Sequence, residues 1–258
     1  MLAFSFVLLS LVLSGLASPA ELSKRDGAPV VTKCSTSNTA ALTFDDGPYI
    51  YMKEVVDTLK AAGGKGTFFV NGKNWGCIYD DGNVEQIKYA YDNGFQIASH
   101  TWSHKDLSTL SWDEIASEMS MTEDAIERII GARPAFTRPP YGNYNDQVLQ
   151  VASSRSQEIV TWDFDSEDSA QSPADVQKQS YDAVINRHPD NILSLQHEVY
   201  DSSVHDVLPY AIQKLQAAGY QLVTLAECIG EEPYLSEGTA KDKDANGDCR
   251  IAGNLNTY

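Results

Sequence analysis

Short runs of apolar, β-branched and aromatic residues alternate along the chain with longer stretches that are apolar at helical spacing. Seven such runs predict strands, at residues 40–44, 66–70, 95–99, 135–138, 158–162, 191–195 and 220–224. The amphipathic stretches 111–130 and 205–219 predict helices, and Gly219 ends the second of them just past its last turn. Strands that alternate with helices favour an α/β fold with a parallel sheet, so we predict a parallel α/β barrel, complete or incomplete.

The first twenty residues have a different pattern from the rest of the chain. Residues 1–20 carry no charge, are apolar through the middle and end in small residues, which is typical of a signal peptide although the positively charged start is missing. The alternative is a buried N-terminal helix. The dibasic Lys24-Arg25 predicts the end of a short propeptide, residues 21–25, so we expect a single domain from 26 to 258. No second apolar stretch of about eighteen residues follows, and we expect a secreted, extracellular protein without a membrane span.

The charge of the chain limits its partners. Its 36 acidic and 19 basic residues give a net charge of −17, which repels the phosphates of nucleic acids and of anionic lipids. We therefore expect no nucleic-acid partner and favour a neutral or cationic one. Solubility in an acidic medium is the alternative explanation of the same charge.

Four cysteines, an even number in an exported chain, predict disulfide bonds. None of them lies in a CxxC pair of the kind that binds zinc, and four cysteines allow three pairings. Cys34 and Cys228 flank the first and last predicted strands, so a bond between them would join the two ends of the barrel. That choice leaves Cys77 to pair with Cys249.

Polar clusters follow five of the predicted strands. They are Asp45-Asp46-Gly47-Pro48, Ser99 to His104, Arg138 to Gly142, Asp163-Phe164-Asp165 and Gln196-His197-Glu198. Any one cluster could be a helix cap or a turn. Because the carboxyl ends of parallel strands meet at one end of a barrel, where such folds place their chemistry, the five together predict an active site.

Two aspartates in sequence and two histidines four residues apart predict a divalent metal. Adjacent strand residues point to opposite faces, so one of Asp45 and Asp46 could bind a cation while the other faces a water molecule. His100 and His104 would share one face of a helical turn. The histidine pair alone is weak evidence, but two histidines with one carboxylate leave coordination positions open, as a catalytic metal site requires.

Five motifs of the chain, TFDDGP, HTWSH, RPPYG, WDFDSED and LSLQHE, resemble in this order those of the polysaccharide deacetylases, carbohydrate esterase family 4. The resemblance runs from about residue 38 to about 228. It implies a distorted (β/α) barrel of seven or eight strands and metal-dependent removal of N-acetyl groups from polymers of N-acetylglucosamine such as chitin. We expect Zn²⁺ as the ion, with Co²⁺ or another divalent metal accepted, and a monomer.

The resemblance also implies a role for each matching residue. The expected general base is Asp45, which Arg138 steadies, and the expected metal ligands are Asp46, His100 and His104. The expected general acid is His197, which Asp165 orients. The backbone N–H of Tyr141 is expected to bind the oxyanion. We expect Tyr141, Trp102 and Tyr49, with Trp75, to contact the sugar, unless they are core aromatics. Two residues depart from the family pattern. Lys105 stands where a proline is common, and Ser169 replaces an aromatic residue that would line the sugar groove.

Three other functions fit parts of the pattern. An O-acetyl xylan esterase would share the fold, and two histidines with a carboxylate also describe a non-haem iron oxygenase. Oxygen activation does not require Arg138, His197 and a second aspartate, however. An inactive chitin-binding protein would not need the intact catalytic set. Residues 242–249 resemble the start of a calcium loop, but Gly253 stands where a glutamate is required, so we favour a turn held by a disulfide.

Overall fold

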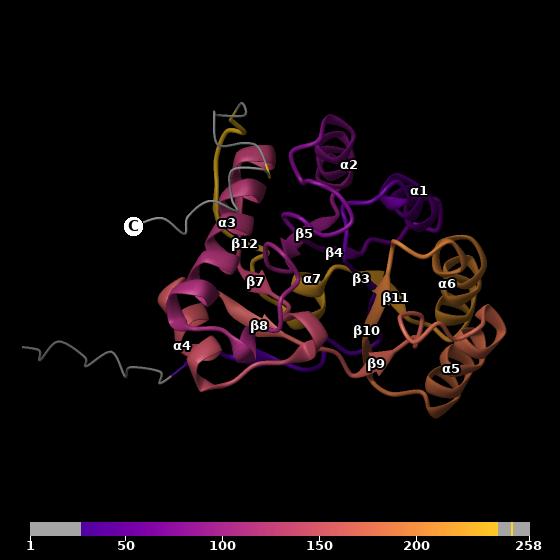
Figure 1. Cartoon of the computed structure of the whole chain (residues 1–258). Coiled ribbons are helices and arrows are strands. Elements are labelled where there is room, and N and C mark those ends of the chain that lie inside the picture. Colours follow the sequence, from indigo (N-terminus) through magenta and orange to yellow (C-terminus); the bar gives the residue numbers. More distant parts are fainter. Residues whose placement is uncertain (1–26, 242–248, 250–258) are drawn as a thin grey trace, which may run out of the picture.

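The computed structural model describes residues 27–241 and residue 249 (Figure 1). The predicted signal peptide, the propeptide and most of the calcium-like segment lie outside these residues. Within the described part of the chain, no helix is long and apolar enough to cross a membrane.

A parallel sheet forms the centre of the molecule. Its strands, in spatial order, are β1 (Val30–Val31), β8 (Glu158–Val160), β7 (Phe136–Thr137), β5 (Gln96–Ser99), β4 (Thr67–Val70), β3 (Thr43–Asp45), β10 (Asn191–His197), β2 (Thr39–Ala41) and β11 (Gln221–Val223). Every neighbouring pair in this order is parallel, and β9 (Phe164–Asp165) also pairs with β10. A separate antiparallel pair joins β6 (Ala132–Pro134) to β12 (Tyr234–Glu237). All seven predicted strands are present, except that 40–44 is divided into β2 and β3, and the predicted α/β fold is confirmed.

Helices surround this sheet (Figure 1). They are α1 (Met52–Ala61), α2 (Asp81–Asp92), α3 (Trp112–Ile130), α4 (Asp146–Ser154), α5 (Ala174–Arg187), α6 (Leu208–Ala217) and α7 (Leu225–Ile229), with short turns η1 (Leu107–Thr109), η2 (Pro140–Gly142) and η3 (Ser203–Val207). The predicted helix 111–130 is α3, which starts at a reciprocal cap between Ser111 and Glu114 and ends at Gly131 with a φ of 79°. The predicted helix 205–219 is divided between η3, a π turn, and α6.

Alternate strand residues separate two layers of core. On β4, Phe68 packs with the residues that face the helices, whereas the neighbouring Phe69 lies in an inner cluster with Ala98 and Leu193. This alternation follows from the two-residue period of a strand and fills the inside of the barrel with side chains. The inside of the barrel is therefore filled mainly by apolar side chains.

The two disulfides are paired as predicted. No strand pairing between β1 and β11 is present in the part of the chain that the structure describes, so hydrogen bonds do not close the barrel. Instead, Cys34, just after β1, is bonded to Cys228 in α7, just after β11, with a Cα–Cα distance of 5.1 Å. The second bond joins Cys77, in the loop between β4 and α2, to Cys249.

Candidate active site

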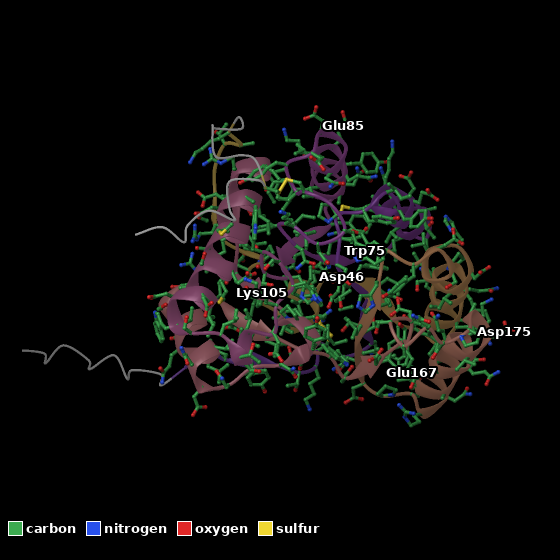
Figure 2. The ribbon with its side chains drawn as sticks, in the orientation of Figure 1. Asp46, Trp75, Glu85, Lys105, Glu167 and Asp175 are labelled. Atoms are coloured by element: carbon green, nitrogen blue, oxygen red, sulfur yellow. A yellow bond between two sulfur atoms is a disulfide. The ribbon has the colours of Figure 1, made fainter. Side chains whose placement is uncertain are left out.

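The five polar clusters meet at the carboxyl ends of the strands. Asp45 is the last residue of β3, His100 follows β5, Arg138 follows β7 and His197 ends β10. Because β3 and β10 are parallel neighbours with Asp45 opposite His197, these two side chains start from the same level of the barrel. Figure 2 shows Asp46 and Trp75 near one another in the middle of the view, away from the peripheral Glu85 and Asp175.

Asp46, His100 and His104 form a group that could hold a metal ion, with their ligand atoms all within 4.8 Å of one another. Oδ1 of Asp46 lies 3.2 Å from Nε2 of His104 and 3.7 Å from Nε2 of His100. Ligand atoms about 2.0–2.1 Å from one tetrahedral zinc ion lie roughly 3.4 Å from each other. The two separations from Asp46 therefore fit the binding of one divalent ion.

Hydrogen bonds prepare this group for a cation. Nδ1 of His100 lies 2.7 Å from the backbone oxygen of Arg138, which only accepts, so Nδ1 carries the proton and Nε2 is left with its lone pair. Asn74 donates to Oδ1 of Asp46 over 3.1 Å. Burial lowers the pKa of His104, which favours the neutral ring that metals bind.

The local backbone differs from two predictions. His100 and His104 do not lie on a helical turn: they stand in a loop in which Thr101 and His104 have positive φ angles of 68° and 55°. Asp46 also has a positive φ, 73°, so the alternation of an extended strand stops at Asp45 and both aspartates turn toward His100. Positive φ costs energy in residues other than glycine, and such strain is typical of functional sites.

Asp45 is held by a buried arginine. Nη1 of Arg138 donates to Oδ1 of Asp45 over 2.7 Å and to the Thr43 hydroxyl over 2.6 Å, and Nη2 donates to the Thr161 backbone oxygen. The guanidinium carbon also lies 4.1 Å from the centre of the Phe69 ring. Asp45 is only 2 % exposed, and its second oxygen, Oδ2, lies 3.7 Å from Nε2 of His100. One oxygen of Asp45 is therefore fixed while the other faces the metal group.

His197 is paired with Asp168, and this corrects the predicted role of Asp165. Nδ1 of His197 lies 2.7 Å from Oδ1 of Asp168, whose Oδ2 accepts from the backbone N–H of His197 and from the Ser203 hydroxyl. Burial lowers the pKa of His197, but the hydrogen bond and charge of Asp168, with the charges of Asp45 and Asp46, raise it to about 9. The structure thus favours a protonated ring.

Asp165 has a different partner, because β9 ends there and the chain then turns. Its Oδ1 accepts from the backbone N–H of Glu167 over 2.7 Å, and burial raises its pKa. The turn places Asp168, three residues later, against His197. Both aspartates belong to the WDFDSED motif, so the sequence showed that an aspartate of this motif could pair with His197 but not which of the two does.

The four aromatic residues expected to bind sugar separate into two kinds. Tyr141 is 66 % exposed and its ring lies 4.8 Å from that of His104, and Trp75 is 50 % exposed. Tyr49, half-buried, packs edge-on against Trp75. Trp102 contradicts the prediction: it is 7 % exposed and covers Gly72, where an added Cβ would lie 1.8 Å from the ring. Trp102 is a core residue.

This position of Trp102 gives a stability prediction. Trp102→Ala should lower the free energy of unfolding by about 3–5 kcal/mol, because it empties a large buried volume. Trp75→Ala is the matched control, since the half-exposed Trp75 should cost much less. Denaturant unfolding of both variants measures the difference. If Trp102→Ala left the stability unchanged and raised the KM for substrate, Trp102 would bind substrate after all.

Three residues to which the sequence analysis gave no role also shape the site. Glu118 of α3 accepts from the backbone N–H of Ser103 over 2.7 Å and from its hydroxyl over 2.5 Å, which fixes the loop that carries His104. Thr43 shares Arg138 with Asp45. Glu198 is fully buried beside Gly47, and burial raises its pKa well above the ordinary value. Lys105, at one departure from the family pattern, extends to Glu118 at 3.4 Å.

Comparison with known proteins identifies the family. The pattern of the family described as "Polysaccharide deacetylase" matches residues 32–160. A chitin deacetylase of Pestalotiopsis sp is 36% identical over 233 residues, which cover 87% of this chain and 76% of that protein. The chitin deacetylase structure from the fungal pathogen Colletotrichum lindemuthianum has a TM-score of 0.75 at 29% identity and covers 80% of this chain and 94% of its own.

A bacterial relative has another polymer in its name. The peptidoglycan-N-acetylmuramic acid deacetylase PdaC of Bacillus subtilis (strain 168) is 36% identical over 188 residues, 72% of this chain and 38% of that protein. Fold, motifs and relatives agree on one class of enzyme, the hydrolases that remove acetyl groups from polysaccharides. The chain belongs to the polysaccharide deacetylase family.

Proposed function

We propose that this enzyme removes N-acetyl groups from chitin or chito-oligosaccharides in a metal-dependent reaction that gives chitosan and acetate. The observation that carries the proposal is the convergence of three groups at one end of the barrel. A potential metal group, Asp46-His100-His104, lies beside Asp45, and His197 stands opposite Asp45 on the neighbouring strand. Hydrolysis of an amide uses all three: a polarising ion, a base for water and an acid for the leaving amine.

Asp46, His100 and His104 would hold the ion, for which Zn²⁺ is our first choice and Co²⁺ an alternative with the same ligands. A divalent ion lowers the pKa of a nearby water and stabilises negative charge on a carbonyl oxygen. Asp45, whose Oδ1 is held by Arg138, accepts the proton of the attacking water at Oδ2. The proposed partner of the oxygen that becomes negative is the backbone N–H of Tyr141.

His197 completes the reaction from the other side. As the bond between the acetyl carbon and nitrogen breaks, the nitrogen takes a proton from His197, so the products are acetate and a free amine. Asp168 keeps the ring oriented and charged through Nδ1, which leaves Nε2 to donate. An oxygenase has no such need for a base held by arginine or for a protonated histidine, and we therefore do not propose that activity.

Chitin is proposed as the substrate because the Pestalotiopsis and Colletotrichum relatives are chitin deacetylases by name. The exposed rings of Tyr141 and Trp75 beside the site suit the apolar faces of sugar units. We further propose that a single domain of residues 26–258 is secreted as a monomer. Two disulfides suit an oxidising compartment, and residues 1–20 have the pattern of a signal peptide.

Acetate release tests the function directly. We expect release from chitin oligomers that stops in chelator and returns with Zn²⁺ or Co²⁺, and little release from acetylated xylan or peptidoglycan. The thermal transition should persist in chelator, because a large core and two disulfides hold the fold without the ion. Faster release from acetylated xylan would make the chain an esterase, and unchanged activity in chelator would exclude the metal.

A further inference from the structure

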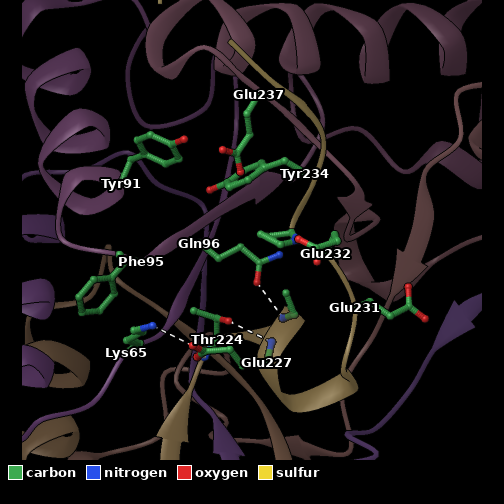
Figure 3. A pocket seen from close by; sticks show the side chains of 13 residues that line it. Lys65, Tyr91, Phe95, Gln96, Thr224, Glu227, Glu231, Glu232, Tyr234 and Glu237 are labelled. Atoms are coloured by element: carbon green, nitrogen blue, oxygen red, sulfur yellow. Dashed lines mark hydrogen bonds and ion pairs between the residues drawn. The ribbon is translucent and has the colours of Figure 1, made fainter. Parts of the chain in front are cut away.

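A second pocket lies at the opposite end of the barrel from the active site. It has a volume of about 350 Å³ and is bordered by Lys65 before β4, by Phe95 and Gln96 at the start of β5, and by α7 and β12 (Figure 3). Gln96 and His100 are separated by the length of β5, four residues at about 3.3 Å each, or roughly 13 Å. The pocket therefore shares no residue with the catalytic groups.

The pocket is strongly acidic. Lys65 is its only cation, and Nζ of Lys65 is already paired with Glu227 at 2.7 Å. The exposed Glu231, Glu232 and Glu237 also line it, and none of these three has an ion-pair partner among the residues that the structure describes. The three carboxylates leave a local excess of negative charge, which favours a cationic ligand and disfavours an anionic one.

A buried amide donor without an acceptor belongs to a side chain that lines the same pocket. Gln96 is 2 % exposed, and its Oε1 accepts from the Ala226 backbone N–H over 2.9 Å and from the Thr67 hydroxyl over 3.1 Å. Because the backbone N–H only donates, these contacts fix which amide atom is oxygen. Nε2 then has no acceptor among the described residues, although it belongs to a pocket-lining side chain (Figure 3). A buried donor left without a partner is unfavourable, and a hydrogen bond to a ligand oxygen would remove that cost.

Aromatic rings supply the third feature. Tyr91 and Tyr234 pack edge to face with centroids 5.6 Å apart, and Phe95 also lines the pocket. The Tyr234 hydroxyl accepts from the backbone N–H of Ile97 over 3.1 Å, so this ring is fixed to β5. Rigid aromatic walls suit the apolar C–H faces of a sugar ring, while the polar groups of the pocket bind the substituents of that ring.

We infer that this pocket binds a protonated amino sugar, a glucosamine unit of an oligosaccharide that carries free amines. The ammonium group meets Glu231, Glu232 and Glu237, a hydroxyl oxygen accepts from Nε2 of Gln96, and the ring packs against Tyr91 and Tyr234. The neutral N-acetyl unit lacks the charge that the carboxylates select. The site goes beyond the proposed function and does not depend on it, although a free amine on a sugar is also what an N-deacetylase releases.

Binding of a glucosamine tetramer to the full chain tests the inference, with the tetra-N-acetylated tetramer as the neutral probe. Below the pKa of its amines, the glucosamine tetramer should shift the side-chain amide NMR signals of Gln96 and bind more weakly in high salt. Glu231→Gln/Glu232→Gln/Glu237→Gln should weaken binding at least tenfold. Glu85→Gln/Asp113→Asn/Asp175→Asn removes the same charge from exposed residues of α2, α3 and α5 and should retain most of the affinity.

Three outcomes would overturn the site. Equal losses in the two triple variants would show attraction by net charge alone. Unmoved Gln96 signals during binding would place the tetramer elsewhere, and equal shifts with the acetylated tetramer would remove the role of the ammonium group. Acetate release is measured separately, so a failure of the proposed catalytic function leaves this result intact, and a failure here leaves the catalytic proposal intact.

Discussion

Asp45→Asn should abolish acetate release and leave the metal bound, whereas Asp46→Asn should lose the metal itself. The two aspartates are adjacent in sequence but have different surroundings. Asp45 is held at Oδ1 by Arg138 and keeps Oδ2 free, so the amide variant retains the hydrogen bond of its oxygen and loses only the ability to take a proton. A positioned base is worth about 10²–10⁴ in rate.

Oδ1 of Asp46 lies close enough to Nε2 of His104 and Nε2 of His100 for the three atoms to bind one ion. An amide at this position removes the one negative charge of the potential ligand set, and the affinity for a divalent ion should fall steeply. Metal content after dialysis, compared with turnover in excess Zn²⁺, separates the two roles. Asp175→Asn, on the exposed surface of α5, is the control for charge alone. If Asp45→Asn lost the ion and Asp46→Asn kept it, the two assignments would have to be exchanged.

The sequence predicted the strands and the end of the barrel that carries the chemistry because both depend on local pattern. Runs such as 66–70 and 95–99 became β4 and β5 almost residue for residue, and a parallel sheet then brings their carboxyl ends together. The cysteine pairing followed from the same topology, since Cys34 and Cys228 flank the ends of the sheet. These predictions required only the order of strands and helices along the chain and no knowledge of how side chains pack.

Side-chain partners were harder to predict, because they depend on loops whose course the pattern does not contain. Asp165 and Asp168 are equal candidates in sequence, and only the turn after β9 decides that Asp168 reaches His197. Trp102 stands between the two histidines of the potential metal group, yet positive φ at Thr101 helps to direct the chain so that the indole covers Gly72. Glu118 is fifteen residues from Ser103 and contacts it only because α3 packs beside that loop.

His197→Ala should damage hydrolysis of the N-acetyl amide far more than hydrolysis of an activated O-acetyl ester. An amine must be protonated as it leaves, whereas a phenolate leaves unaided, so the general acid matters for the first substrate only. Measurement of kcat/KM for both substrates on each variant tests this. Equal losses on amide and ester would mean that His197 positions substrate or water, and another acid would have to be sought.

The partner of His197 gives the same prediction a pH dependence. Amide hydrolysis needs the protonated ring, so activity should fall as the pH rises through the pKa of His197, which Asp168 helps to raise to about 9 against the effect of burial. Asp168→Asn removes that support, and burial then acts with less opposition, so the alkaline limb should move to lower pH for the amide. Asp165→Asn is the matched control, because Oδ1 of Asp165 accepts from Glu167 instead of His197. If Asp165→Asn moved the alkaline limb as far as Asp168→Asn does, the combined negative charge around the site, and not the contact of Asp168 with Nδ1, would be what keeps His197 protonated.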